Sequence, residues 1–190
     1  MLRSPGAGSG PGFTSNTANR GGAADLGTLS TPIASALPTS RMLIVDRGNH
    51  RVLLWNQHPT ASGQAADLVL GQSTGSGTSA NPVGSPTASS LNTPNGVASD
   101  GTRVIVADSG NHRVLIWNSW PTSSGAAANV VLGQPQLTTA TPRGLYAQKR
   151  LFATPVGVTR LGSRLVVTDA DAHRVLLFSA LPIDGTAEAS

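Results

Sequence analysis

Short apolar runs, separated by clusters of Gly, Asn, Asp, Ser and Thr, recur along this chain of 190 residues. Runs that are bounded by turn-forming residues in this way predict short β-strands. In the middle of the chain we expect four strands, at 96–99, 103–107, 113–118 and 129–132. An earlier set of runs has the same layout, at 33–36, 42–45, 51–56 and 67–70.

One segment of the sequence occurs three times, as MLIVDRGNHRVLLW from Met42, VIVADSGNHRVLIW from Val104 and LVVTDADAHRVLLF from Leu165. The copies begin 62 and 61 residues apart, and a fixed period of this kind is typical of a repeat architecture. The second and third strands of each copy are almost continuously apolar, which indicates sheets covered on both faces. We therefore predict an all-β fold, a β-propeller of four-stranded antiparallel blades.

The hairpin between the second and third strands contains the most repeated residues. Gly48 with Asn49, and Gly110 with Asn111, are residue types that tolerate a positive φ in a tight turn. The third copy has Asp171-Ala172 instead, so we expect its turn to differ in conformation or to be strained.

An aspartate opens each hairpin, and an arginine follows it five residues later. The carboxylate can accept N–H groups of the turn, and the guanidinium can return across the hairpin as an ion pair. We expect the histidines between them to form hydrogen bonds within the turn. The residues with this structural role are Asp46, Asn49, His50, Arg51, Asp108, Asn111, His112, Arg113, Asp169, His173 and Arg174.

At these residues the chain resembles the NHL repeat family, whose Asn-His-Leu falls where this chain has Asn49-His50-Arg51 and Asn111-His112-Arg113. The resemblance extends from Leu29 to Leu181. It implies a propeller, typically six-bladed, that serves as a rigid platform for binding.

The repeat divides the chain into the irregular tail of a preceding repeat (1–28), a first blade (29–90), a second (91–150) and a third (151–190) that lacks its fourth strand. The period exceeds the roughly 40–45 residues of a minimal blade, and the excess falls in loops at 73–90 and 135–150. About three blades leave apolar faces and strand edges open. We therefore expect a piece of a longer, six-bladed propeller; the alternative is a homodimer that completes the ring.

Composition agrees with a β-rich fold. The chain has 22 Gly and 13 Pro, only 12% charged residues, and single Glu and Lys residues. It has no Cys, which excludes disulfides and thiolate chemistry, and it has no apolar run long enough to span a membrane. The start lacks a signal peptide, but the Lys-poor loops rich in Ser, Thr and Asn favour a secreted or surface-exposed bacterial protein.

Candidate chemistry is sparse, and we predict no catalytic residue, metal or cofactor. The three repeated histidines lie at equivalent positions of successive blades, too far apart to share one metal. A related propeller, the lyase that completes peptide amidation, binds its metal through histidines near the axis. The innermost strands here, IASA, GVAS and GVTR, contain no His, so such an activity is only a second alternative.

Two features favour contacts with a partner. The stretch 143–164 has several basic residues and no acid, and it is the best nucleic-acid candidate despite a net charge of only +4. Trp55, Trp117 and Phe178 fit a core between blades, whereas we expect Trp120 to be exposed. The predicted contact residues are Trp120, Arg143, Tyr146, Lys149 and Arg150.

The sequence thus predicts a non-catalytic binding scaffold. The loops after the fourth strands and the hairpins between the second and third strands emerge on one face, where repeat proteins usually bind a partner. We expect that partner to be a protein, or a glycan; RNA binding through the basic stretch is the first alternative.

Overall fold

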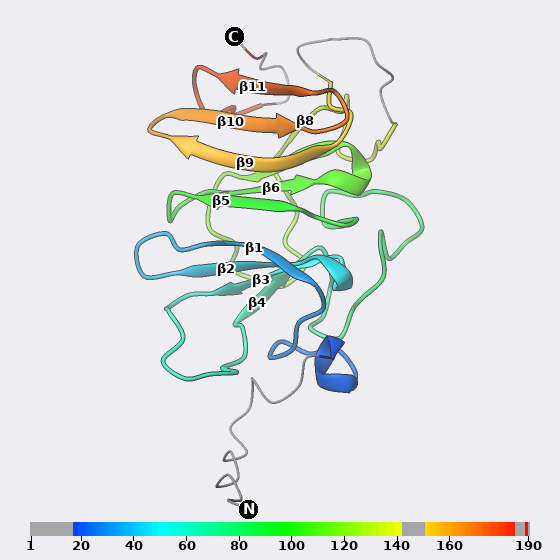
Figure 1. Cartoon of the computed structure of the whole chain (residues 1–190), viewed down its shortest axis with the longest axis vertical. Coiled ribbons are helices and arrows are strands. Elements are labelled where there is room, and N and C mark those ends of the chain that lie inside the picture. Colours follow the sequence, from blue (N-terminus) through cyan, green and yellow to red (C-terminus); the bar gives the residue numbers. More distant parts are fainter. Residues whose placement is uncertain (1–16, 142–150, 185–188, 190) are drawn as a thin grey trace, which may run out of the picture.

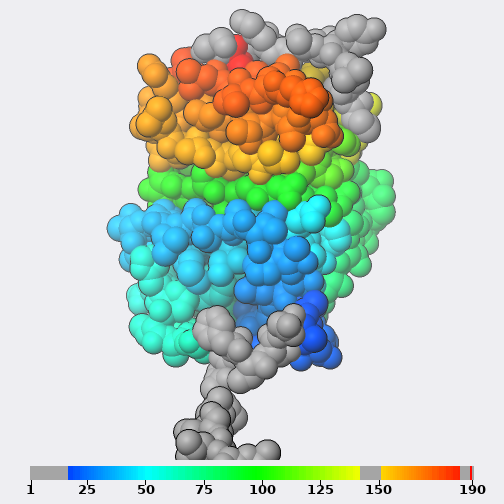
Figure 2. All heavy atoms as spheres, viewed as in Figure 1, coloured from blue at the N-terminus to red at the C-terminus, as the bar shows by residue number. Residues whose placement is uncertain are grey.

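The computed structural model describes residues 17–141, 151–184 and 189 of the chain. In this part of the chain, three antiparallel sheets are stacked on one another along the long axis (Figure 1). The space-filling view shows them as successive layers, from blue and cyan through green to orange (Figure 2). Helical structure among these residues is confined to 3-10 turns at Ala18–Gly21, Arg47–Asn49 and Ser109–Asn111. The all-β prediction is confirmed.

Each sheet is a meander in which consecutive strands pair in antiparallel fashion. The first sheet contains β1 (Pro32–Ala36), β2 (Met42–Asp46), β3 (Arg51–Trp55) and β4 (Leu68–Leu70). The second contains β5 (Gly96–Ser99), β6 (Val104–Asp108), β7 (Arg113–Trp117) and β8 (Val130–Leu132). The third contains β9 (Pro155–Leu161), β10 (Arg164–Asp169) and β11 (Arg174–Phe178). The strands predicted for the first two sheets begin and end within one residue of those observed.

The core lies between the sheets. Side chains alternate along each strand, so each sheet presents two different apolar faces. Between the first and second sheets, one face of β2 and β3 packs against the opposite face of β6 and β7. The residues in this contact are Leu43, Val45, Val52, Leu54, Val104, Val106, Leu115 and Trp117. A second cluster joins the second and third sheets in the same way and includes Phe178.

Burial falls toward both ends of the stack. Every residue of β3 and β7 is buried, as the continuous apolar runs predicted, whereas Val175 in β11 is 65% exposed. In the first sheet, Met42 and Ile44 are only half-buried, and Leu53 and Trp55 form a separate small cluster beside them. The first and third sheets each therefore have an apolar face that no other sheet covers in the described part of the chain.

Candidate functional site

The arginine of the second hairpin is fully buried and anchors three segments of the chain. Its Nε lies 2.7 Å from Oδ2 of Asp108, and the side chains of both residues are 0% exposed. Its Nη2 donates to the carbonyls of Thr87 at 2.9 Å and Ser90 at 3.0 Å, and its Nη1 donates to that of Leu137. Arg113 thereby ties the hairpin to the segments that enter and leave the second sheet.

The first and third sheets repeat this arrangement. Arg51 lies 2.6 Å from Asp46, again with both side chains fully buried, and donates to the carbonyls of Asp25, Thr28 and Gly75. In the third sheet Arg174 lies 3.0 Å from Asp169, but its side chain is 19% exposed. The ion pairs predicted across the hairpins are therefore present in all three copies.

The aspartates differ in one respect from the prediction. Their Oδ1 atoms accept backbone N–H groups from the segment before the first strand, not from the turn: Ser30 donates to Asp46 at 2.5 Å, and Asn92 to Asp108 at 2.7 Å. The turn satisfies itself, because the N–H of the histidine bonds to the carbonyl three residues earlier. Each aspartate therefore holds the entering chain through Oδ1. In the first two copies its Oδ2 also accepts the side-chain amide of the turn asparagine, Asn49 or Asn111, at 2.8 Å, as the sequence predicted.

The prediction that Gly and Asn adopt positive φ in these turns is also wrong. The residues in the left-handed region are the histidines, with φ of 52° at His50, 54° at His112 and 50° at His173. The glycines are required for space, because a Cβ at Gly48 or Gly110 would lie 2.7 or 2.8 Å from the carbonyl oxygen of Ser30 or Asn92. The repeated Gly thus lets the entering segment approach the hairpin.

The third copy, which has Asp171 at this position, keeps the same turn. The His173 N–H donates to the carbonyl of Ala170 at 2.9 Å, as in the other copies. The difference lies in the entering segment, where the Ala170 N–H donates to the carbonyl of Thr154. Thr31 and Thr93, at the equivalent positions of the first two copies, have positive φ of 52° and 43°, whereas Thr154 does not. The side chain of Asp171 is exposed and accepts a hydrogen bond from the Thr154 hydroxyl.

Two of the repeated histidines link successive sheets, which corrects the expectation that they bond within the turn. The Nδ1 of His50 accepts the backbone N–H of Thr93 at 2.9 Å, and the Nδ1 of His112 donates to the carbonyl of Ala153. The left-handed backbone turns each ring toward the next sheet. His50 accepts and His112 donates because the Thr154 N–H, the equivalent of the Thr93 N–H, is already bonded to Asp169, at 2.8 Å.

The electrostatics of these contacts follow from their burial. Burial lowers the pKa of His50, and the nearby Arg47 lowers it further, so the ring is held neutral as its acceptor role requires. Burial raises the pKa of the Asp108 carboxyl, and the guanidinium of Arg113 opposes that rise. Near the other end of the strands, burial alone would raise the pKa of Asp100. Backbone N–H bonds and the guanidinium of Arg160, 3.2 Å away, lower it overall.

The expected exposure of Trp120 is wrong. Its side chain is 8% exposed, its Nε1 donates to Oδ1 of Asn56 at 2.8 Å, and the guanidinium of Arg41 lies 4.4 Å from the ring centroid. The loop between β7 and β8 folds this tryptophan over the first sheet, so it packs between sheets and is closed to a partner. Trp117 and Phe178 lie between sheets as predicted, and Trp55 is buried within the first.

The other predicted contact residues, Arg143, Tyr146, Lys149 and Arg150, lie outside the described residues. Within the described part of the same stretch, Phe152 is fully buried and Arg160 is paired with Asp100. Arg164, the other basic residue of this described part, is exposed, and the nucleic-acid alternative stays a prediction.

The connection between β4 and β5 is fastened close to both of its ends. Gln72 donates to the carbonyls of His50 and Ser79, at 3.2 and 2.8 Å, and Asn81 pairs with Asn111 through their side-chain amides. Between these anchors and Thr87 lies a tip, residues 82–85, in which Val83 is 74% exposed. The predicted surface loop is thus largely fixed to the hairpins and exposes a short apolar tip.

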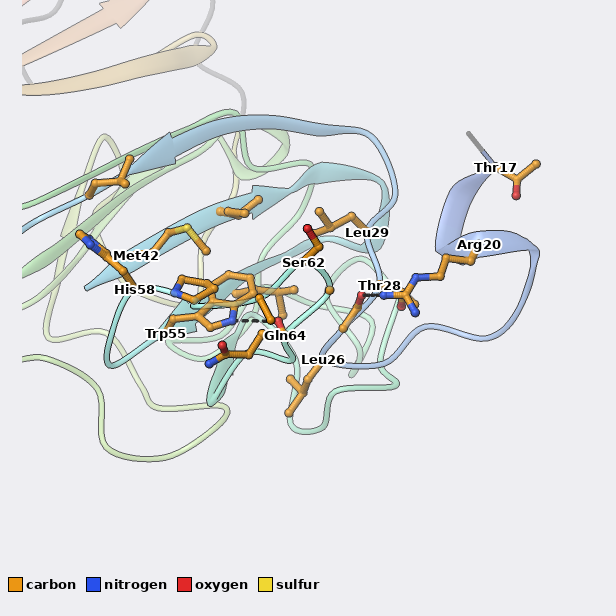
Figure 3. A pocket seen from close by; sticks show the side chains of 17 residues that line it. Thr17, Arg20, Leu26, Thr28, Leu29, Met42, Trp55, His58, Ser62 and Gln64 are labelled. Atoms are coloured by element: carbon orange, nitrogen blue, oxygen red, sulfur yellow. Dashed lines mark hydrogen bonds between the residues drawn. The ribbon is translucent and has the colours of Figure 1, made fainter. Parts of the chain in front are cut away.

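A pocket of about 560 Å³ lies on the open face of the first sheet, and no sequence pattern predicted it (Figure 3). Its apolar wall includes Leu26, Leu29, Met42 and Trp55, and its rim includes the polar side chains of Arg20, His58 and Gln64. The Trp55 Nε1 donates to the Gln64 carbonyl at 3.1 Å, as Trp117 does to Ala126 in the second sheet. In the second sheet the corresponding space is filled by the first sheet.

Three stacked antiparallel sheets with buried hairpin anchors define a partial β-propeller, in which each sheet is a blade. Residues 91–117 match the family model of the NHL repeat. This match begins just before β5 and ends with β7, and it confirms the predicted NHL resemblance in the second copy. A search of curated proteins found no match to this chain.

Two further observations concern the described residues only. No three His, Cys, Asp or Glu side chains among them come together in an arrangement that could hold a metal. In the same ranges, no helix has the length and apolar character needed to cross a bilayer.

Proposed function

We propose that this chain is a non-catalytic interaction scaffold whose loops on one propeller face recognise a protein partner. The supporting observation is that the repeated polar residues form hydrogen bonds and ion pairs within the fold. The most chemically capable groups, the Asp and Arg of the hairpins together with His50 and His112, are occupied with each other and with backbone groups. They hold the blades in place, and recognition is left to the exposed parts of the loops.

The loops in question share one end of the strands. The hairpin between β2 and β3 contacts the connection between β4 and β5 through Gln72, and that connection reaches the hairpin between β6 and β7 through Asn81. These contacts give the face a rigid floor. The tip at 82–85 projects from it with Val83 exposed, and exposed loops on rigid scaffolds commonly carry binding residues.

The test is selection of a displayed random-peptide library on the immobilised full chain, followed by affinity measurement of the recovered peptides. We expect V83D to weaken the selected peptides by about tenfold or more. The matched control is T122D, because Thr122 is also exposed but lies in the loop between β7 and β8, at the opposite end of the strands. Failure to recover peptides, or peptides that ignore V83D, would contradict the proposal.

A further inference from the structure

The two ends of the stack carry apolar faces that match each other. We call one the blade-1 face, formed by the half-buried Met42 and Ile44 and by Leu53 and Trp55, against whose cluster Leu26 and Leu29 pack. The other is the blade-3 face, formed by Val166, Thr168, Val175 and Leu177. We propose that the blade-3 face of one copy of this chain packs on the blade-1 face of a second copy, head to tail. The junction between the first and second sheets is the model for this contact.

The residues of the two faces occupy the same repeat positions as the residues that meet at the junction between the first and second sheets. The first sheet packs Leu43, Val45, Val52 and Leu54 against the second sheet. The residues at the same repeat positions in the second and third sheets lie one and two periods later in the sequence. In the third sheet these equivalents form the blade-3 face. The residues that receive them in the second sheet, Val104, Val106, Leu115 and Trp117, are the equivalents of the blade-1 face.

The pocket described above is the part of the blade-1 face that such a contact would fill. Its volume of about 560 Å³ lies over Met42 and Trp55. Three side chains of the blade-3 face, Val166, Val175 and Leu177, are aliphatic like those that fill the corresponding space in the second sheet, and Thr168 stands where the first sheet has Val45. The blade-3 face of a second copy would therefore fill this pocket with mainly aliphatic side chains, as the first sheet does for the equivalent space on the second sheet.

A polar match accompanies the apolar one. At the first junction, His50 accepts the N–H of Thr93. At the ends of the stack, His173 has the same left-handed backbone as His50, with φ of 50° against 52°, and its ring is exposed. Thr31 has the same positive φ as Thr93, 52° against 43°. Among the described residues, neither the His173 ring nor the Thr31 N–H has a hydrogen-bond partner, and a head-to-tail contact would join them.

A second polar contact follows the same rule. At the first junction, Arg41 reaches from the hairpin between β1 and β2 to the carbonyl of Gly101 in the next sheet. Arg164 occupies the position of Arg41 in the third sheet and is exposed. Thr39, in the first sheet, occupies the position of Gly101 and shares its positive φ, 50° against 88°. Arg164 of one copy would therefore donate to the Thr39 carbonyl of the other.

The experiment measures the mass of the purified full chain by sedimentation velocity over a concentration series reaching about 100 μM. We expect association, giving a closed dimer where the two contacts can form together and longer assemblies where they cannot. V175D, on the blade-3 face, and I44D, on the blade-1 face, should each yield monomers. T122D introduces the same charge at an exposed residue outside both faces and should leave association unchanged.

Mixing gives the decisive result. V175D retains an intact blade-1 face and I44D retains an intact blade-3 face, so a head-to-tail contact predicts that the two monomeric variants form a one-to-one heterodimer. A chain that is monomeric at all concentrations, or a mixture that stays monomeric, overturns the proposal. If I44D does not fold, H173A at the third-sheet end of the stack provides a second variant. We expect it to weaken association by about tenfold.

Discussion

The imidazole of His50 accepts the backbone N–H of Thr93 at 2.9 Å, across the junction between the first and second sheets. The two residues are 43 positions apart in the sequence, and the bond requires an unprotonated Nδ1. A residue of the most repeated motif in the chain therefore has its partner in the next repeat. This bond makes the junction sensitive to protonation.

Acid should weaken the protein through this histidine. The pKa of His50 is lowered in the folded chain from its usual value of 6.5, by burial and then by Arg47. Its contribution to stability is complete above pH 6.5 and is lost as the pH falls through the folded-state pKa, because the unfolded chain takes up the proton first. H50N tolerates the same positive φ and does not titrate. Chemical denaturation at a series of pH values should show a smaller acid loss for H50N than for the wild type, and equal losses would contradict the assignment.

The buried ion pair of the second sheet should be costly to break. R113M leaves the Asp108 carboxylate buried without its countercharge and removes donors from three carbonyls, so we expect a loss of about 3–5 kcal/mol in the free energy of unfolding. R174M makes the same change where the arginine is 19% exposed, and its loss should be smaller. Urea denaturation followed by circular dichroism measures both, and a larger loss for R174M would refute the account.

The glycine of the second hairpin should resist substitution for lack of space. In G110A the new methyl group would lie 2.8 Å from the Asn92 carbonyl oxygen, and we expect a loss of about 1–3 kcal/mol. The control is D171A, at the equivalent position of the third hairpin, where the chain already accommodates a Cβ. We expect D171A to change the free energy of unfolding by less than about 1 kcal/mol. Similar losses for the two variants would show that space is not what selects glycine.

Removing Trp120 should destabilise the fold although it lies in a loop. W120A deletes a ring that is 8% exposed, together with its hydrogen bond to Asn56 and its contact with Arg41, and we expect a loss of about 3 kcal/mol in the free energy of unfolding. His58 occupies the same loop position in the first sheet and is exposed, so H58A should cost less than about 1 kcal/mol. Thermal unfolding followed by circular dichroism compares them; an unchanged midpoint for W120A would mean that the ring is not packed.

The strands and the hairpin ion pairs could be predicted because both depend on short-range patterns. Apolar runs between turn residues locate β5 and β7, and five residues across a hairpin bring Asp108 and Arg113 together whatever the rest of the fold does. The NHL resemblance rests on the same short sequence motif, and the matched residues 91–117 contain the copy in which that motif is most complete.

What could not be predicted depends on the neighbouring sheet. Gly110 is selected by the approach of Asn92, His50 bonds to Thr93, and Trp120 is covered by Arg41. In each case the partner comes from a different run of sequence, placed there by the stacking of blades. The turn alone gives no means of telling a glycine chosen for φ from one chosen for space.

In the anchored connection between β4 and β5, the composition of the tip is separated from the stacking of the blades. Asn81 and Thr87 are held by contacts to Asn111 and Arg113, so the chain enters and leaves the tip at fixed points whatever lies between them. Changes in the length or composition of residues 82–85 therefore have little effect on how the blades stack. Under the proposed function, the same scaffold would acquire new specificities through this tip while its folding stays under the control of residues elsewhere.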